Sequence, residues 1–134
     1  WKLAIKPGRP FAFGEINKTP FIGLPGNPVA AIVTFLMLVI DYLKILSGNK
    51  NVKIKKQMIS SNFSMTKKLG RREWLRGWIV ERNNKKILEK FKTTGSGIIS
   101  SISQSEGIID IDEDVKYIKK GKKLNFRSYE DLLN

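Results

Sequence analysis

A change in hydrophobic pattern near residue 50 constrains the fold of this chain more than any other feature. Before it, residues 28–46 have a helical pattern whose first three turns carry apolar side chains on almost every side. After it, apolar and polar residues alternate, which is the pattern of strands with one buried face. We therefore expect an α/β fragment in residues 1–48, followed by a small all-β barrel domain in residues 51–134 with no long helix between residues 51 and 94.

The helix of the first unit has clear boundary signals. Residues 23–28 read Gly-Leu-Pro-Gly-Asn-Pro. Asn27 is a favoured helix N-cap, and Pro28 is a favoured first helical residue. The pattern predicts a helix that continues to Leu46 and ends at residues 47–49, where Ser-Gly-Asn supplies a left-handed stop.

Short apolar or alternating runs predict the strands. They are residues 1–5, 11–13, 20–24, 51–60, 73–82, 87–93, 107–111 and 122–126. The first three runs are apolar, as buried strands of an α/β sheet are. Asn83-Asn84 is a turn signal, so the strands on either side of it should form a hairpin. Residues 96–106 predict one short helix.

The composition narrows the classes of function. The chain has 25 Lys and Arg against 12 Asp and Glu, a net charge of +13, which favours anionic partners such as nucleic acid, phosphate ligands or membrane surfaces. Because the lysines are scattered, a basic surface that merely faces water remains the alternative. The 134 residues include neither cysteine nor histidine. Disulfides, Cys-based metal sites and Ser-His-Asp or Cys-His catalysis are therefore excluded within this segment.

The longest apolar run predicts no membrane span. Residues 29–40 make up about a dozen residues, and a membrane-spanning helix needs about 20. We expect a soluble, intracellular protein. The chain begins at Trp1, so we also expect it to be part of something longer.

The loop at residues 23–28 is a candidate anion site. A strand that ends in a Gly/Pro turn and feeds a helix N-terminus presents backbone N–H groups and the positive end of the helix dipole. Lys2 and Lys6 share one strand face and would clamp a phosphate or oxyanion beside it. The alternatives are a well-capped turn and two solvated lysines. The candidate binding residues are Lys2, Lys6, Pro25, Gly26, Asn27 and Pro28.

The predicted hairpin carries a second candidate binding site. Arginines at 71, 72 and 76 are interleaved with Trp74 and Trp78. They would grip a planar anionic ligand by forked hydrogen bonds and stacking, or a nucleic acid, as small barrels often do. A basic surface strand with core tryptophans is the competing interpretation.

Two polar clusters are further candidate sites for a ligand or a metal ion. Ser96 lies in a Thr-Thr-Gly-Ser-Gly run whose hydroxyls would hold an oxyanion or cap a helix. Asp110, Asp112, Glu113 and Asp114 have the spacing of a calcium loop but lack its glycine and distal glutamate. We interpret this acidic cluster as a strand end and turn, and we predict no metal site within the chain.

At these segments the sequence resembles the molybdopterin molybdenumtransferase family (MoeA and the gephyrin E domain). The matching pieces are residues 1–8 (Trp-Lys-Leu-Ala-Ile-Lys-Pro-Gly), 23–29 (Gly-Leu-Pro-Gly-Asn-Pro-Val), 70–77, where Gly-Arg-Arg leads to Leu-Arg-Gly, and 95–101, where Gly-Ser leads to Ser-Ser. They occur in the family's order and extend over most of the chain. Trp74 stands where Phe is usual, and Arg9 where many members have Lys.

The resemblance implies the end of a molybdopterin-binding α/β domain followed by the family's C-terminal barrel. It implies an enzyme that takes adenylylated molybdopterin and molybdate and releases molybdenum cofactor and AMP with the help of a divalent cation such as Mg²⁺. By position, Lys2, Lys6, Pro25 and Pro28 match cleft residues. Arg76 and Ser96 match residues of the barrel and of the Gly-Ser element.

The same resemblance implies features outside these residues. The family's acidic residues, which the reaction and its metal need, lie upstream of Trp1, so this fragment alone should be inactive. A cytoplasmic homodimer is expected, with an anionic small-molecule substrate, no specific nucleic acid and no membrane. The alternative functions are a gephyrin-like peptide-binding scaffold and a basic nucleic-acid-binding barrel. The residues do not distinguish molybdate from tungstate.

Overall fold

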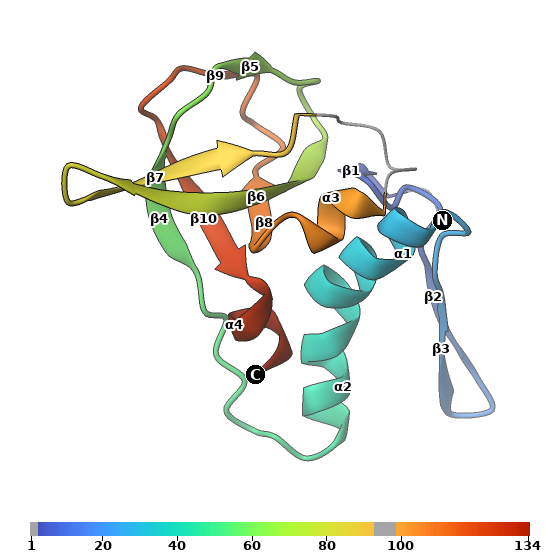
Figure 1. Ribbon diagram of the computed structural model, residues 1–134. Helices are drawn as coiled ribbons and strands as arrows, with labels where there is room; N and C mark the ends of the chain where they lie inside the picture. The colour runs from blue at the N-terminus through green and yellow to red at the C-terminus, as the bar shows by residue number, and fades with distance from the viewer. Residues whose placement is uncertain (1–2, 93–98) are drawn as a thin grey trace.

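The computed structural model describes residues 3–92 and 99–134. Its strands are β1 (Ile5–Lys6), β2 (Ala12–Ile16), β3 (Thr19–Gly23), β4 (Gln57–Ser61), β5 (Met65–Thr66), β6 (Arg72–Arg82), β7 (Lys85–Lys90), β8 (Gly107–Ile111), β9 (Tyr117–Ile118) and β10 (Lys123–Ser128). Its helical segments are α1 (Pro28–Thr34), a π-helical segment η1 (Phe35–Val39), α2 (Ile40–Leu46), α3 (Ser100–Ser103) and α4 (Tyr129–Leu133). Figure 1 shows the strands of the barrel on one side of the molecule and the long helix on the other.

Five strands close into the predicted small barrel. Around the ring, β6 pairs with β7, β7 with β4, β4 with β10, β10 with β8, and β8 again with β6. Apolar side chains fill its interior, among them Leu88, Ile109 and Phe126, each at most 1% exposed. Closure leaves few free strand edges, which are a liability in an open sheet. Residues 51–92 form strands and turns and contain no helix.

The predicted hairpin is confirmed, and its turn explains its register. Asn83 and Asn84 take positive φ angles of 52° and 59°, the conformation of a two-residue turn that suits the twist of paired strands. On β6, Leu75 packs into the barrel interior, whereas Trp74 packs on the outside of the barrel, under the helix. The period-2 pattern therefore separates two apolar cores, one on each face of the same strand.

The long helix has the predicted bounds. Asn27 caps it, Pro28 begins it, and the helical segments run without a break to Leu46, where Ser47 is the C-cap and Gly48 has a φ of +93°. The π-helical segment in its middle was not predicted, because an extra residue in one turn leaves no mark on an all-apolar stretch.

The helix packs against the barrel. Val29 and Val33 of α1 are fully buried and share a cluster with Trp74, Ile108 and Leu132. The helix is long and apolar enough to cross a membrane by length and composition alone. Val29, Val33, Leu36 and Ile40 share a hydrophobic cluster with residues of β6, β8 and α4, whereas Ile32, Leu43, Ile45 and Leu46 are exposed.

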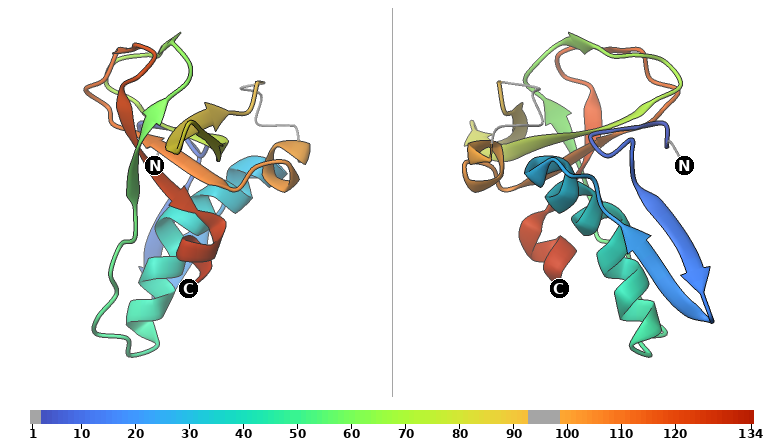
Figure 2. Two further views of the ribbon diagram at one scale, coloured as in Figure 1. Left: turned by 60° about the vertical axis from the view of Figure 1, so that its left-hand side comes forward. Right: turned by 90° about the vertical axis from the view of Figure 1, so that its right-hand side faces the viewer.

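The N-terminal strands differ from the expected buried α/β strands. β2 and β3 form an antiparallel hairpin that projects beside the helix (Figure 2). Phe13 and Phe21 are 54% and 50% exposed, although the Phe13 ring meets Tyr42 of α2 edge-on. No α/β sheet forms within residues 3–48: β1 pairs in parallel with barrel strand β6 instead. The apolar runs correctly predicted strands, but a sequence pattern does not indicate which other segments pack against those strands.

One further strand prediction shifts, and three short elements were not predicted. β4 begins at Gln57, whereas the pattern predicted a strand from residue 51. Residues 52–56 contain alternating lysines, yet no neighbouring strand pairs with them, and alternation alone does not make a strand. The pair β5–β9 and helix α4 were not predicted, because each is too short to show a period.

Candidate functional site

A cavity of about 570 Å³ lies where the N-terminal loop, the start of α1 and the start of β6 meet. Five of the predicted binding residues line it: Lys6, Pro25, Gly26, Asn27 and Arg76. Pro28, next to them, is exposed and is not part of the lining. Lys2 and Ser96 lie outside the described residues. The structure thus brings together residues that are separated by as many as 70 positions, and we call this space the anion cavity.

Strand β1 positions Lys6. Its two residues pair in parallel with β6, so that Lys6 lies opposite Glu73. Gly8 lets the following loop approach the helix, because a Cβ at this position would come within 2.1 Å of Cγ2 of Thr34 and its φ is +114°. Lys6 is therefore held between the barrel and the helix, at the wall of the anion cavity.

Asn27 satisfies the amides that begin the helix. Its Oδ1 accepts hydrogen bonds from the N–H groups of Val29 and Ala30, both at 3.1 Å, and its backbone carbonyl accepts from Ala31 at 2.9 Å. The sequence predicted that free N–H groups of this turn would face a ligand. That prediction is wrong for these three amides, because the cap already uses them. The helix dipole and the side chains remain to attract an anion.

Arg76 is the most unusual residue of the anion cavity. Its side chain is buried at 3% exposure, with Nε donating to Oγ of Ser101 at 3.2 Å and Nη1 donating to the carbonyl of Trp74 at 3.3 Å. Burial lowers the pKa of Arg76, and the nearby Tyr129 opposes that effect. Within the described part of the chain, no carboxylate forms an ion pair with it. A buried guanidinium without a counter-charge attracts an anion.

The charge of the lining has one sign. Arg9, Lys68 and Arg71 join Lys6 and Arg76, and no Asp or Glu lies among the lining residues. Arg71 is partly neutralised, since its Nη2 lies 2.7 Å from Oε1 of the buried Glu73, just outside the lining. Arg9 and Lys68 were not among the predicted binding residues. Each lies next to a loop glycine or within two residues of one. Arg9 also stands at a position where many members of the resembling family have Lys, whereas Lys68 offered no other sequence signal.

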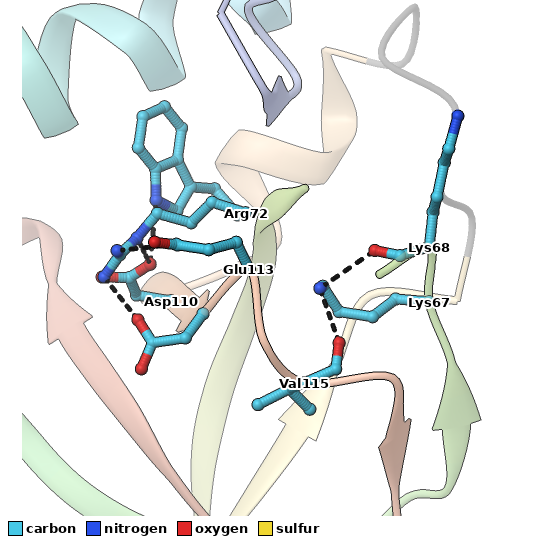
Figure 3. Close-up of polar contacts among 8 residues, drawn as sticks. Lys67, Lys68, Arg72, Asp110, Glu113 and Val115 are labelled. Carbon is cyan, nitrogen blue, oxygen red and sulfur yellow. Dashed lines mark hydrogen bonds and ion pairs between the residues drawn. The ribbon is translucent and has the colours of Figure 1, made fainter. Parts of the chain in front are cut away.

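Arg72 is not part of this site. It binds Asp110 through two hydrogen bonds, of 2.8 and 3.0 Å, and contacts Asp112 at 2.8 Å and Glu113 at 3.4 Å (Figure 3). These ion pairs raise the pKa of Arg72, the hydrogen bond to Asp110 most of all. Its neighbour Trp74 donates from Nε1 to Asp110 at 3.0 Å. The acidic cluster thus lies at a strand end, as expected, and pairs with Arg72.

One other predicted role changes with the structure, and Lys67, for which no role was predicted, has a structural one. Trp74 is 3% exposed and belongs to the core under the helix, so stacking of its ring face on a planar ligand is not supported. Lys67 is 5% exposed and donates to the carbonyls of Val115 and Lys68, which holds the loop before β6 in place, whereas the side chain of Lys68 points away from it (Figure 3).

The described residues contain no cluster of metal-ligating side chains. Across residues 3–92 and 99–134, no group of three or more His, Cys, Asp or Glu side chains is placed to hold a metal ion. Three of the carboxylates at the end of β8 are already paired with Arg72. The chemistry that these residues support is the binding and orientation of an anion.

Comparison with known proteins agrees with this architecture. Residues 60–128 match the family described as the MoeA C-terminal region (domain IV). Molybdopterin molybdenumtransferase of Haemophilus influenzae is 33% identical over 99% of this chain, which spans about a third (33%) of that relative's length.

Solved structures give the same result. The molybdopterin biosynthesis MoeA protein of Pyrococcus horikoshii has a TM-score of 0.74 and 30% identity over 96% of this chain and 31% of its own. A molybdenum cofactor biosynthesis protein of Pyrococcus furiosus has a TM-score of 0.72 and 31% identity over 94% of this chain and 43% of its own. The chain therefore belongs to the MoeA family, whose C-terminal region it carries in residues 60–128.

Proposed function

We propose that this chain is part of an enzyme that inserts molybdate into adenylylated molybdopterin and releases molybdenum cofactor and AMP. The names of its relatives support a place in molybdenum cofactor biosynthesis. In this proposal the anion cavity binds an anionic group of the substrate. The observation that carries it is Arg76, a buried cation without a carboxylate partner in the described chain, on the wall of a cavity lined by basic residues.

The charges of the substrate suit this cavity. Adenylylated molybdopterin carries a diphosphate link, and molybdate is an oxyanion. An arginine offers planar, forked donors to phosphate oxygens, and Lys6 adds a mobile ammonium group on the same wall. Binding of this kind would hold the reacting groups in one geometry and stabilise the charge that the transfer moves.

Other parts of the enzyme complete the reaction in this proposal. The described carboxylates do not fit a divalent cation, so the Mg²⁺ ligands and the catalytic acids would lie in residues other than these. We further propose a soluble, cytoplasmic homodimer without specific nucleic-acid binding. The lysines outside the cavity are scattered, so any binding of nucleic acid should be weak and should fade with salt.

The test replaces Lys6 in the intact protein. Lys6→Ala should lower cofactor formation from adenylylated molybdopterin and molybdate by about tenfold or more, since a charge-assisted contact to phosphate is lost. Lys18→Ala is the matched control, because Lys18 lies on the β2–β3 turn, away from the cavity lining. The assignment is wrong if Lys6→Ala forms cofactor at the wild-type rate, or if Lys18→Ala is equally damaged.

A further inference from the structure

A second hollow, of about 710 Å³, lies on the wall of the barrel between β4 and β7, and it shares no lining residue with the anion cavity. We propose that this hollow, the β4–β7 seam, binds an extended acidic peptide segment of a partner protein, which adds to the barrel as a strand. The lining residues that carry this proposal are Met58, Lys85, Lys86, Lys120 and Lys123.

The seam exists because two neighbouring strands pair over only part of their length. β4 and β7 run in parallel, and their pairing consists of Ser60 with Ile87 and Ser61 with Leu88. The first residues of both strands, from Gln57 and from Lys85, lie outside this pairing. Figure 1 shows β7 beside the end of β4, where the two strands pair.

The free backbone groups of β4 follow from strand alternation. The N–H of Ser61 donates to the carbonyl of Lys122, and its carbonyl accepts from Gly121, so Ser61 faces the β10 side. Successive residues of a strand point their backbone groups to opposite sides. Met58, three residues earlier, therefore faces the seam, where the β4–β7 register gives it no partner.

The same reasoning applies to β7. The carbonyl of Leu88 accepts from the N–H of Asn62 at 2.9 Å, so Leu88 faces β4. Lys86, two residues earlier, faces the same side; the Ser60–Ile87 bridge uses its carbonyl, and its N–H has no partner across the seam in the β4–β7 register. Unpaired N–H and C=O groups on a strand edge are the template on which an extended peptide forms main-chain hydrogen bonds.

The charge of the seam lining indicates which kind of peptide would bind there. Four lysines line the seam, and its lining contains no Asp or Glu. Met58, at 57% exposure, adds an apolar surface among them. A strand whose side chains alternate between acidic and apolar would match both features, because its carboxylates meet the lysines while its apolar residues reach Met58.

The same lining favours a peptide over a nucleic acid. Proteins that bind single-stranded nucleic acid combine a basic groove with aromatic side chains on which bases stack. The seam is basic, but no Phe, Tyr or Trp lies in its lining. Its unpaired backbone edge is a feature that a peptide uses and a phosphate backbone does not.

The experiment measures binding to the intact protein by fluorescence anisotropy with three probes. The first is a labelled peptide of about eight alternating Glu and Val residues, long enough to span one strand. The second is the same peptide with N-methylated amides, which keeps the charge but removes the strand donors. The third is an oligouridine of equal charge. We expect the parent peptide to bind at least about tenfold more tightly than either of the other two, because only it can both pair as a strand and neutralise the lysines.

Matched variants locate the site. Lys85→Glu/Lys86→Glu should weaken binding of the parent peptide by about tenfold or more, through loss and reversal of charge. Lys18→Glu/Lys116→Glu makes the same change in net charge at exposed lysines outside the seam, and should stay within about twofold. Equal binding of the N-methylated peptide, tighter binding of the oligouridine, or equal loss in the two double variants would each overturn the proposal.

Discussion

Arg127 at the end of β10 donates from Nη2 to Oδ2 of Asp41 at 3.3 Å, a contact between residues 86 positions apart. The Arg127 side chain is only 7% exposed. Lys44 lies 3.8 Å from the same carboxylate and donates to the carbonyl of Leu132. The far end of the helix is therefore attached to the barrel by charge, as its near end is by the apolar cluster around Trp74.

Removal of the Asp41 charge should destabilise the protein. Asp41→Asn leaves the Arg127 guanidinium buried without its counter-charge, and we expect the free energy of unfolding to fall by about 1–3 kcal/mol. Urea unfolding followed by tryptophan fluorescence measures the change. Asp114→Asn removes an exposed carboxylate with no ion pair among the described residues, and should stay within about 0.5 kcal/mol. Equal effects of the two substitutions would contradict the role of the Asp41–Arg127 pair.

Gly77 should be intolerant of any side chain. A Cβ at this position would lie 2.5 Å from the carbonyl oxygen of Glu89 and 2.7 Å from Cδ1 of Ile109, inside the barrel. Gly77→Ala should lower the free energy of unfolding by about 1–3 kcal/mol, because the closed barrel cannot expand locally. Gly14→Ala, where a Cβ meets nothing within 4 Å, is the control in thermal unfolding. If the Gly77→Ala protein is as stable as the Gly14→Ala protein, the barrel can accommodate the added methyl group and the prediction is wrong.

Asn27 allows helix capping to be separated from anion binding. In Asn27→Asp a carboxylate still accepts the hydrogen bonds of Val29 and Ala30, so stability should be unchanged or slightly higher. The added negative charge enters a lining that has no acidic residue, and should weaken binding of adenylylated molybdopterin by about tenfold.

Asn27→Ala is the complementary variant. It loses the cap and about 1 kcal/mol of stability without adding a charge. Calorimetry of ligand binding, together with thermal unfolding, measures both quantities for the two variants. If Asn27→Asp binds the substrate as the wild type does, the anion does not sit beside the start of the helix.

Tyr129 should make stability fall in alkaline solution. Burial raises the pKa of its hydroxyl, while the hydrogen bond with Ser105 and the charge of Arg76 oppose the shift. A group with a raised folded-state pKa contributes stability that is complete below its unfolded pKa of about 10 and is lost as pH rises through the folded value. The free energy of unfolding should therefore decline above about pH 10, and Tyr129→Phe should decline less steeply. Unfolding of both proteins from about pH 8 to 11 tests this, and parallel curves would contradict it.

Several features of this protein were open to prediction from the sequence. The helix from Pro28 to Leu46 was predictable because its cap, its first proline and its terminal glycine act within a few residues. The β6–β7 hairpin was predictable because Asn83-Asn84 suits a two-residue turn. The candidate residues around Lys6 and Asn27 came from the same short-range signals, supported by the family resemblance.

Only the tertiary structure decided how these elements combine. No local signal indicates that β8 pairs back onto β6 to close the barrel, that β1 extends the same sheet, or that β2 and β3 remain exposed. The burial of Arg76 has the same origin. The sequence shows a strand arginine, and only the fold brings it to Ser101 and buries it beside the cavity. Local structure depends on neighbours along the chain, whereas burial and strand partners depend on contacts between distant segments, which one sequence does not encode in any short pattern.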